Sequence, residues 1–159
     1  MEQRVLAKWL KIIIIGVGIC GIGICFGVLP ACGNAILYDY PELTNCFWPW
    51  LIFLWVCCVP CYVILGLGWK IANQIGKNQS FSNANAEYLK WISWVMSGDA
   101  AFFMVGNILL LLVNMSHPGV MLLSLIVVFV GIAVAVAAAV LSHLVKKAAD
   151  LQEQSDLTI

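Results

Sequence analysis

The sequence has very few charged residues. Aspartate, glutamate, lysine and arginine together make up 10% of its 159 residues, whereas 63% are hydrophobic. At a mean hydropathy of +0.99, a chain of this length has more apolar surface than one soluble core can bury. The formal net charge is zero, and the dense basic patch that nucleic-acid-binding domains use is missing. We therefore expect a membrane protein that does not bind nucleic acid directly.

Sequence motifs of the common enzyme classes are also absent. The chain has no nucleotide-binding loop, no nucleophile elbow and no zinc motif. His117 and His143 are isolated, without a cysteine or carboxylate at ligand spacing, so we expect no metal site. The inverted repeat that builds many transporter protomers is missing as well. The sequence favours a non-enzymatic protein without a cofactor, although it leaves enzymatic activity open.

Four long apolar runs fill most of the chain. A helix needs about 18 or more apolar residues to cross roughly 30 Å of hydrocarbon. The runs cover residues 12–29, 47–69, 91–113 and 120–144. Since no stretch is left for a soluble domain, we expect one transmembrane domain over residues 1–159. Its fold class would be all-α, a four-helix bundle in the lipid bilayer.

The basic residues predict the orientation of that bundle. All eight lie before the first run, between the second and third, or after the fourth: Arg4, Lys8, Lys11, Lys70, Lys77, Lys90, Lys146 and Lys147. Cytoplasmic segments carry the excess of lysine and arginine, so we expect both termini in the cytoplasm. The connections 30–46 and 114–119 would then lie outside. A cleaved signal peptide is the competing interpretation of the N-terminus, but its apolar stretch is too long for one.

The connection between the second and third runs is the most polar internal segment. We expect Gly76 to cap the second helix in the left-handed conformation. Ser82 or Asn83 suits the N-cap of the third helix, which would begin before the membrane boundary at Trp91. Five residues of this segment form a pattern within GKNQSFSNANAEYLKWISW: Gly76, Phe81, Ser82, Asn85 and Leu89.

This pattern resembles the hallmark segment of the DUF2975 family of bacterial membrane proteins. In that family a G-x-P-F-[ST] turn between the second and third helices is followed by an asparagine and a leucine. Here Gln79 and Ser80 stand where the family often has glycine or proline. The resemblance implies a multi-pass protein of the bacterial plasma membrane without an assigned activity, and topology and length extend it to nearly the whole chain.

The resemblance also implies a partner. Genes of the family often lie beside one for a small helix-turn-helix regulator. By analogy, the 70–90 connection would bind such a regulator in the cytoplasm and give the protein a signalling role. The sequence does not identify the partner further, and it does not give the oligomeric state.

Asp99 is the only charged residue inside an apolar run. An aspartate at that depth costs several kcal/mol unless it is paired, hydrated or protonated, so it is a functional-site candidate by default. Asn107, about two turns further on, would continue a polar track. The alternative is a protonated or hydrogen-bonded Asp99 that only fixes helix packing. No lysine or arginine lies at its depth to form an ion pair.

Seven cysteines provide the second set of candidates: Cys20, Cys25, Cys32, Cys46, Cys57, Cys58 and Cys61. Cys32 and Cys46 fall in the expected outer connection, where the surroundings permit a disulfide. Cys58 and Cys61 form a C-x-x-C motif. The alternative function is therefore a quinone-linked thiol–disulfide oxidoreductase that uses Cys58 and Cys61 with the outer pair. Depth counts against it, because hydrocarbon disfavours the reactive thiolate.

Small residues predict where helices approach one another. Gly23 and Gly27 form a GxxxG step in the first run, and Gly131, Ala135 and Ala139 form a line in the fourth. Such residues let helix backbones come close in lipid. We expect both sets to pack inside the chain rather than against a second copy.

Overall fold

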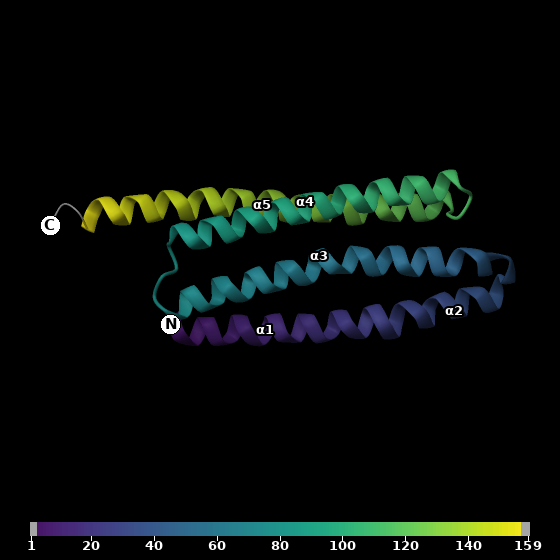
Figure 1. Cartoon of the computed structure of the whole chain (residues 1–159), viewed down its shortest axis with the longest axis horizontal. Helices are drawn as coiled ribbons and strands as arrows, with labels where there is room; N and C mark the ends of the chain where they lie inside the picture. The colour runs from purple at the N-terminus through teal and green to yellow at the C-terminus, as the bar shows by residue number, and fades with distance from the viewer. Residues whose placement is uncertain (1–2, 157–159) are drawn as a thin grey trace.

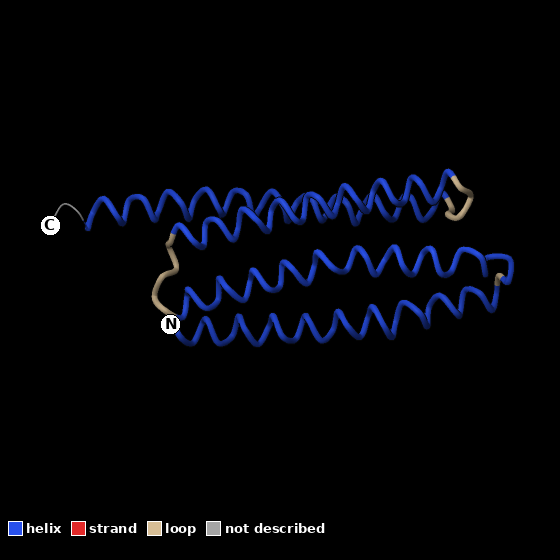
Figure 2. The backbone as a smooth tube through the Cα atoms, viewed as in Figure 1, coloured by secondary structure: helices blue, strands red, loops and turns tan. Residues whose placement is uncertain are grey.

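The computed structural model describes residues 3–156 of the chain, and nearly all of these are helical (Figure 2). The elements, in order, are α1 (Gln3–Gly23), the π-helix η1 (Ile24–Val28), α2 (Leu29–Asp39), the short 3-10 helix η2 (Pro41–Leu43), α3 (Thr44–Gly76), α4 (Asn83–Leu112) and α5 (Pro118–Asp156). Because α1, η1 and α2 are continuous, the described residues form four spans long and apolar enough to cross a membrane: Gln3–Asp39, Pro41–Gly76, Asn83–Leu112 and Pro118–Ser155. The prediction of an all-α chain with four membrane-length helices is confirmed.

The four spans lie in chain order as an open row. α1 packs against α3, α3 against α4, and α4 against α5 (Figure 1). Within residues 3–156, α5 touches neither α1 nor α3, and α1 does not touch α4. The row differs in this respect from the compact bundle that the sequence suggests. Lipid tails are as apolar as the side chains, so the hydrophobic effect does not drive the row to close on itself.

α1 begins and α5 ends at the same end of the molecule, where the α3–α4 connection also lies (Figure 1). The α2–α3 and α4–α5 turns lie at the opposite end. α5 continues past the other helices at the end where the termini lie. Which of the two ends faces the cytoplasm stays a prediction.

The expected outer connection, residues 30–46, is helical instead of a loop. α2 occupies most of it, and only Tyr40 lies outside the helical elements. The first apolar run was expected to end before Pro30, and a proline ring does clash with the carbonyl four residues earlier in a regular helix. Just before Pro30 the helix widens into η1, and the Leu29 N–H bonds to the Ile24 oxygen, five residues back. This wider turn lets the helix continue past the proline.

Two asparagines, and no glycine, adopt the left-handed conformation among the described residues. Asn78 has φ 60° and Asn114 has φ 55°. The Gln79 N–H donates to the Gln74 oxygen at 3.0 Å, and the Asn78 N–H donates to the Ile75 oxygen at 3.1 Å. This pair of bonds is a Schellman cap, whose left-handed residue is usually glycine and sometimes asparagine. The predicted left-handed role of Gly76 is therefore wrong, and Asn78 has it.

Small residues of α5 face α4. A Cβ atom added at Gly131 would lie 3.5 Å from the Cβ of Ala100, and Ala135 is 3% exposed. Ala138 is buried, whereas Ala139 is exposed. The predicted packing line is thus correct for Gly131 and Ala135, and it continues through Ala138 because the contact face follows steps of three and four residues.

The GxxxG step of the first span does not face a neighbouring helix. A Cβ atom added at Gly23 or Gly27 would meet nothing within 4 Å. Close approach occurs instead at Gly21, where an added Cβ would lie 2.8 Å from the Tyr62 hydroxyl oxygen. The prediction that Gly23 and Gly27 pack inside the chain is wrong.

Candidate functional site

The α3–α4 connection is held in shape by the side chain of Asn85, in the first turns of α4. Its Nδ2 donates to the carbonyl oxygens of Gln79 at 3.1 Å and Ser80 at 3.0 Å. Asn85 is only 1% exposed. Ser82 is the N-cap of α4, and its hydroxyl oxygen accepts the Asn85 N–H at 3.3 Å. Together the two side chains fix the backbone of the connection to the start of α4.

Gly76 serves the packing of α1 on α3. A Cβ atom at position 76 would lie 3.3 Å from the Cβ of Ala7, which is buried, as is Ala72 one turn earlier. The Ser80 hydroxyl donates to the Gln3 side-chain oxygen at 3.1 Å, so the start of α1 is also tied to the connection. Gly76, like Ser82 and Asn85, therefore has a structural role, and Leu89 is half-buried on α4.

Phe81 is the member of the pattern that these contacts do not explain. Its side chain is 59% exposed. The residues just before it in the connection, Lys77, Asn78 and Gln79, are exposed and polar. The connection thus presents one aromatic ring among polar groups, on a backbone that Asn85 and Ser82 hold in place.

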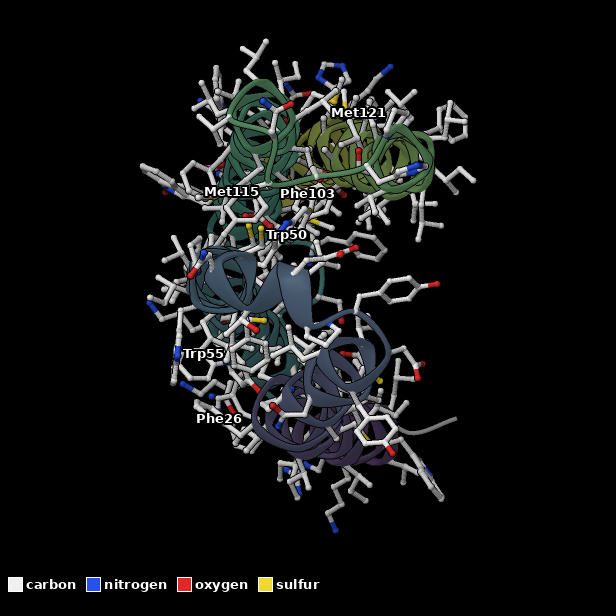
Figure 3. All side chains as sticks on the ribbon, turned by 90° about the vertical axis from the view of Figure 1, so that its right-hand side faces the viewer. Phe26, Trp50, Trp55, Phe103, Met115 and Met121 are labelled. Carbon is white, nitrogen blue, oxygen red and sulfur yellow. The ribbon has the colours of Figure 1, made fainter. Side chains whose placement is uncertain are left out.

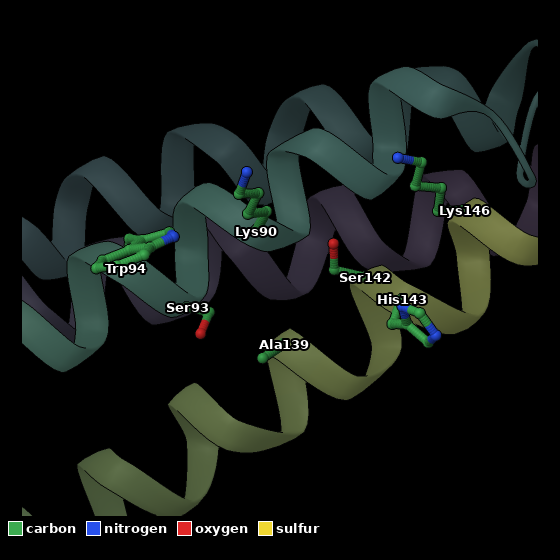
Figure 4. A pocket seen from close by; sticks show the side chains of 7 residues that line it. All are labelled: Lys90, Ser93, Trp94, Ala139, Ser142, His143 and Lys146. Atoms are coloured by element: carbon green, nitrogen blue, oxygen red, sulfur yellow. The ribbon is translucent and has the colours of Figure 1, made fainter.

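A hollow lies between α4 and α5 near this connection (Figure 4). Its lining consists of Lys90, Ser93 and Trp94 from α4 and Ala139, Ser142, His143 and Lys146 from α5. Ser142 is already engaged, because its hydroxyl donates to the Ala86 carbonyl oxygen at 2.6 Å.

Asp99 and Asn107 each leave one buried oxygen without a hydrogen-bond partner in the described part of the chain. Asp99 is half-buried, midway along α4. Asn107 is 1% exposed, and its Nδ2 donates to the Phe103 carbonyl oxygen at 2.8 Å. A buried oxygen without a hydrogen-bond partner lowers the stability of the fold, so Asp99 and Asn107 both remain functional-site candidates. The continuous polar track between them stays a prediction.

The cysteines of the C-x-x-C motif in α3 make different contacts. The Cys58 thiol meets the Cys25 thiol of η1, with the two Sγ atoms 2.7 Å apart. The Cys61 thiol donates to the Cys57 carbonyl oxygen of its own helix at 3.7 Å. The two cysteines of the C-x-x-C motif therefore differ: Cys58 contacts the first span, and Cys61 bonds within α3.

The Cys25–Cys58 contact was missed by sequence reasoning. The two residues lie 33 positions apart, and no local spacing rule links them. They meet only because α1 and η1 pack along α3. All seven cysteines are free thiols, so the Cys32–Cys46 disulfide stays a prediction.

The backbone around Cys25 is held by an aromatic side chain of α3. Trp55 Nε1 donates to the Cys25 carbonyl oxygen at 2.8 Å. The Trp55 ring also packs on Phe26, with ring centroids 5.4 Å apart (Figure 3). One turn of α3 thus contacts Cys25 twice, through Trp55 at its carbonyl and through Cys58 at its thiol.

Comparison with known proteins places the chain among membrane proteins without an assigned activity. Residues 31–159 match the model of a family described as "Protein of unknown function (DUF2975)". The chain is 28% identical over 159 residues to the "Uncharacterized membrane protein YoaS" of Bacillus subtilis (strain 168), and the match covers 99% of each chain. No solved structure matches it. The family match includes the α3–α4 connection, Cys58 and Asp99, and it begins after Cys25.

Proposed function

The chain belongs to the DUF2975 family, and we propose from this premise that it is a non-enzymatic docking protein of the bacterial plasma membrane. In this proposal the α3–α4 connection lies in the cytoplasm and binds a soluble protein partner. The family resemblance suggests a small helix-turn-helix regulator as that partner. The multi-pass architecture provides the anchor, and the connection provides the contact.

The exposure of Phe81 carries the proposal. A polar turn that only joined two helices would not need an aromatic ring that is 59% exposed. Aromatic residues are the common anchors of protein interfaces. The hydrogen bonds from Asn85 to the carbonyls of Gln79 and Ser80 hold the connection in one shape. A preformed loop loses little conformational entropy on binding, and this favours recognition.

The distribution of basic residues supports the cytoplasmic orientation. The basic residues of α1 precede its apolar run, and Lys77 lies in the α3–α4 connection. Lys146 and Lys147 lie towards the end of α5, the same end of the molecule (Figure 1). In the proposed orientation all of them follow the rule that lysine and arginine accumulate on the cytoplasmic side.

The oxidoreductase alternative has weaker support. It needs Cys58 and Cys61 to exchange disulfides with Cys32 and Cys46. Cys46 precedes Cys58 by twelve residues of the same helix, which is about 18 Å at 1.5 Å per residue. Cys58 contacts Cys25 instead. A relay between Cys46 and Cys58 would require α3 to unwind between them.

Site-specific photo-crosslinking in the native host tests the docking proposal. A benzophenone amino acid placed at Phe81 should form an adduct with one soluble protein, identified by mass spectrometry. The same amino acid at Leu151, which is also 59% exposed and lies near the end of α5 at the same end of the molecule, is the matched control and should not capture that protein. If position 81 gives no protein adduct, or only those seen from position 151, the connection is not a docking site.

A further inference from the structure

The thiols of Cys25 and Cys58 form a contact between the first and second spans that the docking function does not use. We propose that this pair is a redox-modification site. A lipid-dissolved two-electron oxidant of the quinone class converts the two thiols into a disulfide that joins η1 covalently to α3. The inference is independent of any partner at Phe81.

The positions of the two sulfur atoms fit a disulfide. Their Sγ atoms are 2.7 Å apart, whereas the S–S bond of a disulfide measures about 2.05 Å. A shift of well under one ångström per residue would therefore bring them into bonding distance. Their helices already pack side by side, so bond formation does not require the spans to rearrange.

The surrounding α3 turn holds Cys25 in place for this bond. Trp55 and Cys58 lie three residues apart and so project from the same side of the helix. The indole N–H of Trp55 binds the Cys25 carbonyl oxygen at 2.8 Å, while Cys58 meets the Cys25 thiol. Cys25 itself lies within η1, and π-helical turns inside α-helices are frequent at functional sites.

The location of the pair determines the class of oxidant. Cys25 is 5% exposed, and Cys58 lies near the middle of α3, about 21 Å along the helix from Thr44. Charged soluble thiols and disulfides do not reach that depth, but quinones dissolve in the hydrocarbon. Two S–H bonds break and one S–S bond forms. Two electrons and two protons pass to the quinone, which leaves as the quinol.

The reaction is a slow modification and not a catalytic turnover. Hydrocarbon disfavours the thiolate on which rapid thiol chemistry depends. Once formed, the bond lies away from soluble reductants. Oxidation would therefore report the redox state of the quinone pool over long times, by locking the first span to the second.

Thiol counting after quinone treatment tests the proposal. The wild-type protein in lipid nanodiscs is incubated with a short-chain ubiquinone, denatured in acid and alkylated with maleimide. Mass spectrometry should show two of the seven thiols protected, in one peptide pair that joins Cys25 to Cys58, and dithiothreitol should restore both. If all seven thiols still react, or if the disulfide joins another pair, the proposal is overturned.

A matched pair of variants keeps the test independent of the other cysteines. One variant retains only Cys25 and Cys58, and the other retains only Cys20 and Cys58, with serine at the remaining cysteine positions. Cys20 lies on the same span but is exposed. The first variant should lose both thiols to the quinone and the second neither. Equal loss in the two variants would show unselective oxidation and would refute a built site.

Discussion

The α1–α3 pair and the α4–α5 pair are both antiparallel helix pairs, yet they are built differently. α4 and α5 meet through small residues such as Ala100, Gly131 and Ala135, and one serine hydroxyl binds a backbone carbonyl across the interface. In α1–α3 the backbone is irregular, because the first span includes a π-helix and α3 contains two prolines. Aromatic side chains of α3 reach backbone carbonyls of the first span.

This difference in packing distinguishes a helix pair that mainly stabilises the fold from one that holds reactive side chains. Small residues in regular helices give close packing and little chemistry. The α1–α3 pair instead contains the thiol contact of Cys25 with Cys58 and a Tyr62 hydroxyl that donates to the Gly18 carbonyl oxygen at 2.9 Å. We infer that α4–α5 stabilises the fold, while α1–α3 can change its chemical state. The α3–α4 connection joins the two pairs.

The two pairs are held together along α3 and α4. Trp50 Nε1 of α3 donates to the Met115 carbonyl oxygen in the α4–α5 turn at 2.6 Å, and both residues are labelled near the α3–α4 boundary in Figure 3. Phe53 stacks on Phe103 of α4, with ring centroids 5.7 Å apart. Since α5 does not contact the first span among the described residues, the α3–α4 interface is the packing contact between the two pairs, in addition to the α3–α4 connection.

The largest expected loss of stability is at the α3–α4 interface, where the two helix pairs meet. A Cβ atom at Gly106 of α4 would collide with the Phe53 ring, so Gly106→Ala should destabilise the protein by roughly 1–3 kcal/mol through overpacking. Reversible unfolding in mixed detergent micelles measures the change. Gly98→Ala is the matched control on the same helix, because its added Cβ meets nothing within 4 Å. Equal stability of the two variants would contradict the close α3–α4 contact.

The second prediction concerns the α3–α4 connection, whose backbone should become more mobile without the Asn85 side chain. Asn85→Ala removes both hydrogen bonds to the carbonyls of Gln79 and Ser80, and we expect a loss of about 1 kcal/mol, because water can bind the carbonyls of this exposed connection. Limited proteolysis should cut the connection faster than in the wild type. Asn83→Ala, at an exposed neighbouring position, serves as the control. Unchanged cleavage in Asn85→Ala would mean that the amide does not hold the loop.

A smaller effect probes the α4–α5 pair. Ser142→Ala removes the hydroxyl that binds the Ala86 carbonyl oxygen at 2.6 Å. Interhelical hydrogen bonds in membranes contribute about 0.6 kcal/mol on average, so the loss should be of that size in the same unfolding assay. A loss several times larger would show that α4 and α5 depend on this bond more than on their small residues.

The smallest expected effect concerns Asp99. Asn has nearly the shape of a protonated aspartate, so Asp99→Asn should leave unfolding almost unchanged if the carboxyl group only fixes packing. The second measurement compares the phenotype of the native host that carries Asp99→Asn with that of a host that lacks the gene. Loss of the phenotype with intact folding would instead assign Asp99 a functional role. The test is made at Asp99 because one of its carboxyl oxygens is buried without a hydrogen-bond partner among the described residues.

Hydropathy predicted the number of membrane-length helices because it depends on local composition. The N-cap at Ser82 was predictable for the same reason. The passage of the first span through Pro30 was not, because a π-turn upstream overrides the usual effect of proline. The meeting of Cys25 with Cys58 depends on how α1 lies on α3. In lipid, helix-facing and lipid-facing residues are both apolar, so hydrophobic periodicity does not mark the contact faces.

The orientation of the α3–α4 connection is the central claim of the docking proposal, and cysteine labelling tests it most directly. Single cysteines replace Gln79 in the connection or His117 in the α4–α5 turn, in a chain whose own cysteines are serine; both sites are exposed. With a membrane-impermeant maleimide, position 117 should label in intact cells and position 79 only after permeabilisation. Labelling of position 79 in intact cells, with position 117 protected, would contradict a cytoplasmic docking site.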